Sequence, residues 1–136
     1  QIDIKMDFDT VAKAGSMLGS AAVIVMDDTT CMVRAAARLA KFFNHESCGQ
    51  CTPCREGTNW MELVLDRIEE GHGRPGDPDL LMSVSKNVGG NSLCALGDAA
   101  IGPVRSLIQR FRPEVEQHIE RQACPFPRRR YFEKRA

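Results

Sequence analysis

Hydrophobic and charged residues alternate along the amino-terminal segment of the chain. The apolar members of this pattern are Ile2, Ile4, Met6 and Phe8. A period of two predicts a strand with one solvated face over residues 2–8. The short apolar run 21–26 predicts a second, buried strand. Residues 1–28 therefore read as a short β segment.

From residue 29 the period changes to three and four, which is typical of amphipathic helices. Thr29 or Thr30 can cap a first helix that ends near Asn44. A second helix follows a loop at 46–56, with an apolar stripe that includes Trp60. We interpret that tryptophan as a core residue.

Two further helices are predicted downstream. Asp77 followed by Pro78 suits the start of a third helix, and paired glycines at 89–90 suit its end. The fourth helix either starts or kinks at Pro103, and the pattern leaves both possibilities open. A more polar helix follows Pro113 and ends near residue 122, and an extended basic tail comes after it.

The predicted fold is mainly α: a small four-helix bundle preceded by a short β segment. Its expected divisions are 1–28, 29–122 and 123–136. The chain starts at Gln1 within a patterned segment. We therefore expect it to be one piece of a longer polypeptide.

The charge balance limits the possible partners. Lys and Arg total 18 and Asp and Glu total 18, so there is no global field that would attract nucleic acid or an anionic membrane. No apolar run approaches the roughly 20 residues that a membrane span needs. We expect a soluble chain with no targeting signal, no direct membrane insertion and no nucleic-acid partner.

The six cysteines indicate metal or redox chemistry in a reducing compartment. Cys48, Cys51 and Cys54 form a C-x-x-C-x-x-C run, whose spacing lets three thiolates converge on one [4Fe-4S] cluster. Gly49 permits a tight loop, and Cys54 comes near the amino end of the second helix, where free N–H groups favour an anion. A fourth thiolate must come from elsewhere in the chain.

The candidates for the fourth ligand are Cys31, Cys94 and Cys124. Cys31 opens the first helix, a helix length away from the loop, and suits a small buried apolar residue. Cys124 lies in a proline- and arginine-rich tail with little core to position it. Cys94 follows the glycine stop and precedes the fourth helix, so a bundle can bring it beside the loop. We assign Cys94.

Bland alternatives exist for these features. A structural zinc could use the same four cysteines, although zinc sites usually present separated pairs. His45 most simply closes the first helix at its last carbonyls. The basic run Arg128, Arg129 and Arg130 could bind RNA or an acidic neighbour, but a solvated tail explains it. We assign no catalytic residue.

The segments 46–57 and 92–98, which contain the four cysteines, resemble the NADH-binding flavoprotein subunit of respiratory complex I. Residues 14–20, 23–27 and 111–114 are similar to that family as well. The likeness covers nearly the whole chain up to about Glu120. Flavoprotein subunits of NAD-linked hydrogenases and formate dehydrogenases are the alternative within the same chemistry.

The resemblance implies an FMN- and NADH-binding domain upstream, a β-grasp-like middle domain whose trailing strands are residues 1–28, and a helical [4Fe-4S] domain. No glycine-rich nucleotide loop occurs in this chain. The expected function is therefore an electron relay within NADH:quinone oxidoreductase, from NADH-reduced FMN to further iron–sulfur centres. The chain alone is not expected to turn over NADH.

The family also implies partners and neighbours of the cluster. Ala95 and Leu96 would lie toward the flavin, and the loop residues around the cluster would be Gly49, Gln50, Arg55 and Ser92. Expected partners are the upstream domain, the thioredoxin-like iron–sulfur subunit and the large multi-cluster subunit of the peripheral arm. The expected location is the cytoplasmic face of the bacterial inner membrane or the matrix side of the mitochondrial one.

Overall fold

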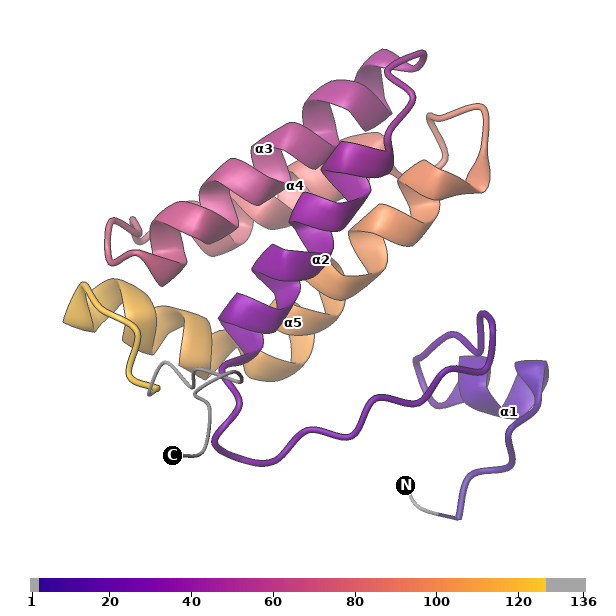
Figure 1. Cartoon of the computed structure of the whole chain (residues 1–136), viewed down its shortest axis with the longest axis horizontal. Helices are drawn as coiled ribbons and strands as arrows, with labels where there is room; N and C mark the ends of the chain where they lie inside the picture. Colours follow the sequence, from indigo (N-terminus) through magenta and orange to yellow (C-terminus); the bar gives the residue numbers. More distant parts are fainter. Residues whose placement is uncertain (1–2, 127–136) are drawn as a thin grey trace, which may run out of the picture.

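Four of the five helices pack against one another, and the fifth lies apart from them (Figure 1). The computed structural model describes residues 3–126. Its helices are α1 (Phe8–Lys13), α2 (Met32–Glu46), α3 (Thr52–Glu69), α4 (Asp77–Val88) and α5 (Ala95–Arg121). The predicted mainly α class is confirmed. None of the helices in the described residues is long and apolar enough to cross a bilayer.

A single apolar core joins α2, α3, α4 and α5. Each helix contributes residues spaced by three or four positions, so that one face of every helix is buried. Completely or almost completely buried members include Val33, Met61, Leu65, Ile68, Leu81 and Val104. This shared core fixes the loops at both ends of the helices, where the chemically interesting residues lie.

A buried ion pair connects α3 to α4. Asp77 is only 2% exposed, and the guanidinium of Arg67 contacts both of its carboxylate oxygens, with Nε at 2.9 Å from Oδ2. The backbone N–H of Arg74 donates to the same carboxylate at 2.9 Å. Burial raises the pKa of Asp77, but these hydrogen bonds outweigh it and leave the pKa below its usual value.

The last helix is longer than the sequence suggested, and its bend is elsewhere. α5 begins at Ala95 and continues through Pro103, so the fourth helix does not start at that proline. Non-helical backbone occurs instead at Phe111 (φ −125°, ψ 23°), two residues before Pro113. Proline lacks the N–H of a helical hydrogen bond and its ring clashes with the carbonyl four residues earlier, which accounts for this kink. The polar helix expected after Pro113 is the second half of α5.

Three local predictions were wrong. Cys31, and not a threonine, caps α2, because both Thr29 and Thr30 bond to the Asp27 carboxylate. Trp60 is 52% exposed, since it lies just off the buried face of α3. His45 is exposed, and its Nδ1 lies 3.1 Å from the Glu46 carboxylate instead of meeting helix carbonyls.

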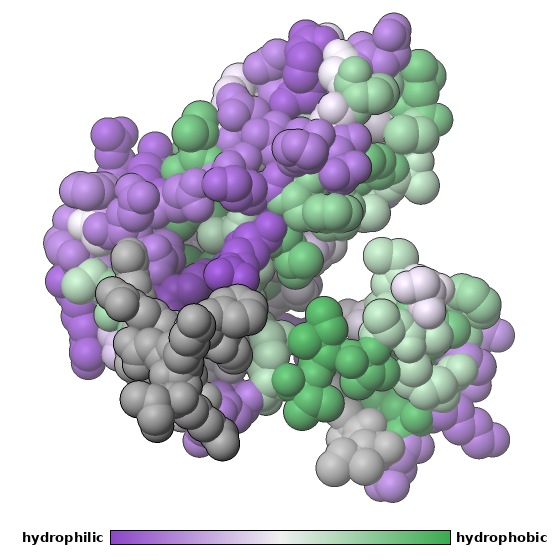
Figure 2. All heavy atoms as spheres, viewed as in Figure 1, coloured by the Kyte–Doolittle hydropathy of each residue, from purple (hydrophilic) through white to green (hydrophobic). Residues whose placement is uncertain are grey.

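The predicted β segment is not confirmed. No strand occurs between residues 3 and 126, and a short helix, α1, begins where the first strand should end. Residues 21–26 run as an extended, unpaired segment between α1 and α2, and Val25 is 90% exposed. Figure 2 shows strongly hydrophobic side chains at the surface beside the four packed helices. A strand needs a hydrogen-bonding partner, and the described part of the chain supplies none.

The amino-terminal segment nevertheless touches the packed helices. Arg110 on α5 donates to the carbonyl of Ala14 at 3.2 Å. An open hollow of about 760 Å³ lies between residues 15–26 and the facing sides of α2 and α5. Of the predicted tail, only residues 123–126 are described, and the basic run at 128–130 lies outside the described residues.

Candidate metal centre

The cysteine loop and the segment before Cys94 meet at one end of the packed helices. The loop joins α2 to α3, and the other segment joins α4 to α5 (Figure 1). The backbone N–H of Leu93 donates to Cys51 Sγ at 3.4 Å. Cys51 is the residue at the N-cap of α3 and Cys94 the residue at the N-cap of α5. The two segments that carry the predicted cluster ligands are therefore in direct contact.

The loop is tightly turned and held in place. Gly49 has φ +78°, a left-handed conformation that a residue without a Cβ adopts at little cost. Arg55 reaches back from α3 and donates to the Gly49 carbonyl at 2.7 Å, while its Nε pairs with Glu56 at 2.8 Å. Ser47 Oγ lies 3.4 Å from Cys54 Sγ. The loop shape is thus set by its own residues and by α3.

Two helix amino ends face this site without side-chain caps. Neither Cys51 nor Cys94 makes a side-chain hydrogen bond to its helix. Unsatisfied N–H groups and the helix dipole favour negative charge at such ends. α3 starts earlier than the sequence suggested, so Cys54 lies within its first turn and is buried. This local field suits an anionic group ligated by thiolates.

A buried hydroxyl beside Cys94 has no hydrogen-bond partner among the described residues. This atom is Ser92 Oγ. Its side chain is close to Gly97, where an added Cβ would come within 2.5 Å of Ser92 Oγ. A buried polar atom without a partner is costly, and a sulfur-rich group at this place would give it an acceptor. The four thiols, the free amides and this hydroxyl fit a cluster with four cysteine ligands.

Exposure differs among the predicted site residues. Cys54 is buried and Cys51 half-buried, whereas Cys48 and Cys94 are exposed. Gln50 and Ala95 are exposed, and Leu96 is half-buried. The loop therefore has one side within the protein and one side open to a neighbour.

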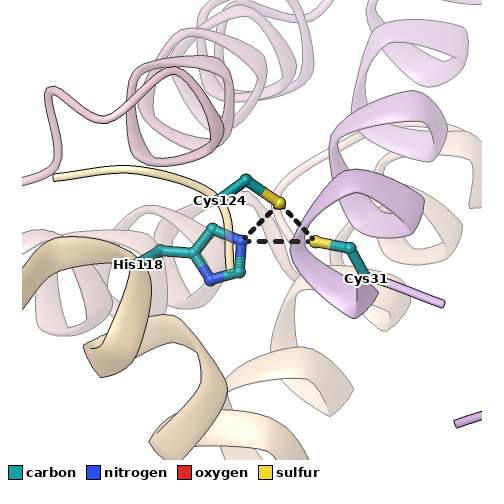
Figure 3. Close-up of side chains that lie close together, drawn as sticks. All are labelled: Cys31, His118 and Cys124. Atoms are coloured by element: carbon teal, nitrogen blue, oxygen red, sulfur yellow. Dashed lines mark hydrogen bonds between the residues drawn. The ribbon is translucent and has the colours of Figure 1, made fainter. Parts of the chain in front are cut away.

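The sequence missed a second cluster of metal-binding side chains at the other end of α2. Cys31, His118 and Cys124 come together there (Figure 3). Both cysteines are remote from the cysteine loop, as predicted, but Cys31 is more than an apolar filler and Cys124 is not in an unsupported tail. Cys124 and Phe126 pack against the core. The spacing of His118 and Cys124 was the available local signal, while Cys31 lies 87 residues from His118.

Fold and site together define a helical iron–sulfur protein. The chain belongs to the NADH-ubiquinone oxidoreductase-F iron–sulfur binding region family, whose model matches residues 34–118. The matched range includes all four predicted cluster cysteines, and the family's cofactor is a [4Fe-4S] cluster. This assignment favours iron–sulfur over the zinc alternative at the cysteine loop.

Relatives agree with that family. The chain is 52% identical over 126 residues to an NADH-quinone oxidoreductase F subunit of Rhizobium meliloti (strain 1021), covering 93% of the chain and 30% of that protein. It is 49% identical to the corresponding protein of Mycobacterium tuberculosis (strain ATCC 25618 / H37Rv), covering 92% of the chain and 28% of the relative. The chain thus spans less than a third of these relatives.

A solved structure shares the fold. This is the NAD+-reducing [NiFe]-hydrogenase in its H2-reduced state, at TM-score 0.63 and 37% identity, covering 74% of this chain and 17% of the hydrogenase chain. The same helical region therefore occurs in two kinds of NAD-linked oxidoreductase. FMN and NAD belong to the full-length oxidoreductase-F protein and not to this segment.

Proposed function

We propose that this chain is the electron-relay segment of an NADH dehydrogenase flavoprotein subunit, and that Cys48, Cys51, Cys54 and Cys94 hold its [4Fe-4S] cluster. The contact between Leu93 and Cys51 Sγ carries this proposal, because it joins the three-cysteine loop to the segment of the fourth ligand. The cluster supplies one-electron transfer when bound. The protein's part is to hold four thiolates and to tune the charge around them.

The residues around the thiols have separate parts in this proposal. The Leu93 amide and the Ser92 hydroxyl would donate to sulfur, which stabilises negative charge there. Arg55 would add a positive charge and hold the Gly49 turn, and Gln50 lies in the same turn. Such neighbours set the reduction potential of a cluster.

The open side of the site suits electron entry. Cys94 and Ala95 are exposed, and Leu93 is 88% exposed although it is apolar. An exposed apolar side chain beside a redox ligand is suited to a docking surface. We propose that Ala95 and Leu96 lie toward the flavin of the upstream domain.

The apolar segment 21–26 supports a second contact with upstream residues. Val23, Ile24 and Val25 are each at least 70% exposed, as in an unpaired strand. We propose that residues 1–28 complete a β-grasp-like domain of the full subunit, that 29–122 form a four-helix bundle domain and that 123–136 form a tail.

The wider assembly follows from the family. Electrons would pass from NADH-reduced FMN through this site to the thioredoxin-like iron–sulfur subunit and the large multi-cluster subunit, and finally to quinone. The assembly would lie peripherally on the cytoplasmic face of a bacterial inner membrane or on the matrix side in mitochondria. The likeness to an NAD+-reducing hydrogenase supports a second candidate, the diaphorase subunit of a hydrogenase or formate dehydrogenase.

Fusing the chain to its upstream domain tests the relay. The chain alone, with its cluster, should be reduced by dithionite but not by NADH, because hydride transfer requires a flavin beside a nucleotide site. The fusion should gain NADH–ferricyanide activity. Tight FMN binding with NADH turnover by the 136 residues alone would contradict the proposal.

A further inference from the structure

Three metal-binding side chains converge at the end of α2 remote from the cysteine loop (Figure 3). His118 Nε2 lies 3.3 Å from Cys31 Sγ and 3.3 Å from Cys124 Sγ, and the two sulfurs are 3.7 Å apart. Cys31 and His118 are buried, and Cys124 is half-buried. Two thiols and an imidazole therefore surround one small volume.

These separations match the edges of a tetrahedral zinc site. With Zn–S at about 2.3 Å and Zn–N at about 2.0–2.1 Å, tetrahedral angles place two sulfurs about 3.8 Å apart and sulfur and nitrogen about 3.5 Å apart. We propose that Cys31, His118 and Cys124 bind one Zn²⁺ ion, with water or another donor at the fourth position. Thiolate and imidazole ligands are the set that zinc prefers.

The histidine is oriented as a metal ligand. Its Nδ1 lies 2.8 Å from the backbone carbonyl of Glu114. A carbonyl can only accept, so Nδ1 carries the proton and Nε2 presents its lone pair to the two sulfurs. Zinc-bound histidines usually donate their second ring N–H to a carbonyl or carboxylate in this manner. The ring also stacks on Phe126, with centroids 6.3 Å apart.

The surrounding charges favour thiolates at this place. The Arg34 guanidinium donates to Cys124 Sγ at 3.1 Å, and the Arg34 backbone N–H donates to Cys31 Sγ at 3.3 Å. Arg34 is held by Glu69 at 2.8 Å. Hydrogen bonds to ligand sulfurs, and a nearby cation, stabilise the negative charge of a two-thiolate site.

The site is separate from the proposed iron–sulfur centre. The 15 residues of α2 put about 22 Å between its two ends. The family match covers residues 34–118, so Cys31 and Cys124 lie outside it. The inference therefore does not depend on the relay function.

The ion would fasten three segments together. Cys31 starts α2, His118 lies in the half of α5 that follows the kink, and Cys124 follows α5. Glu114 already links the last two helices in this way, because its carboxylate accepts from the Met32 N–H at 2.7 Å. A metal at this junction would hold the kinked end of α5 against the start of α2.

Metal content and zinc-edge X-ray absorption test the site in the full chain purified anaerobically with its cluster. We expect one zinc per chain, with two sulfurs at about 2.3 Å and one nitrogen at about 2.0 Å. Cys31→Ser, His118→Gln and Cys124→Ser should each lose the zinc and keep the iron. The matched control is His45→Gln, which removes an exposed imidazole and should keep both metals.

Three results would overturn the proposal: less than a tenth of a zinc per chain, equal zinc in the triple variant, or a Cys31–Cys124 disulfide in the anaerobic protein. A variant that folds poorly would show reduced helical circular dichroism. In that case the wild-type chain decides, because added Zn²⁺ should raise the melting temperature of the zinc-free protein. No rise would count against the site.

Discussion

The backbone N–H of Leu93 meets Cys51 Sγ at 3.4 Å across 42 residues of sequence. This single hydrogen bond joins the loop before α3 to the loop before α5. It also directs a donor at a sulfur that is predicted to carry negative charge, where hydrogen bonds are stronger than between neutral groups. The relationship underlies the ligand assignment that the first prediction tests.

Replacing any of Cys48, Cys51, Cys54 or Cys94 with serine should abolish or convert the cluster. Each serine removes one of the four thiolates that a [4Fe-4S] cluster needs. Cys31→Ser and Cys124→Ser are the matched controls and should keep it. Iron content and low-temperature paramagnetic resonance of the reduced protein measure the outcome. An intact cluster in Cys94→Ser together with its loss in Cys124→Ser would refute the assignment.

Arg55→Glu should lower the reduction potential of the cluster. The reduced state is the more negative one, and Arg55 lies at the loop, bonded to the Gly49 carbonyl. A partly screened charge contributes about 1 kcal/mol, or about 40 mV for one electron, so tens of millivolts are expected. Arg55→Gln should shift it by less. A redox titration that shows no change, or a rise, would argue that Arg55 does not act on the cluster.

Gly57→Ala should destabilise the packing of α3 on α4. An added Cβ would lie 2.2 Å from Val88 Cγ2, so one of the two helices must move. Overpacking of this kind costs about 1–3 kcal/mol. Urea unfolding measures the loss. In the background of Val88→Ala the same glycine substitution should cost less, and an equal cost in both backgrounds would show that the clash is not its cause.

Asp77→Asn should reduce stability by about 1–3 kcal/mol at neutral pH, because Arg67 loses a charged acceptor. Burial raises the pKa of Asp77, but the hydrogen bonds from Arg67 and Arg74 lower it further, so the folded pKa is below the unfolded one. Its stabilisation is therefore complete above a pH of about 4 and disappears as the pH falls through the folded value. Unfolding free energies of both proteins at several pH values measure this. A gap that widens in acid would contradict it.

The sequence determined the helices and the three-cysteine loop. Their signals are local: a period of three to four residues, proline and glycine at helix ends, and a short ligand spacing. α4 begins at Asp77, as the aspartate–proline pair predicted, and the core positions of α3 follow the apolar stripe except at Trp60. The assignment of Cys94 also needed only the order of helices and stops, and it stays a prediction until iron is measured.

Only the tertiary structure decided what the other cysteines do. Cys31, His118 and Cys124 come together because Phe111 and Pro113 bend α5 toward the start of α2, and no local pattern encodes that contact. The predicted strands failed for a related reason. Alternation describes a face that could be buried, but a strand exists only where another backbone accepts its hydrogen bonds, and between residues 3 and 126 none does. Local periodicity sets which residues can form an element, and long-range contacts set which neighbours complete it.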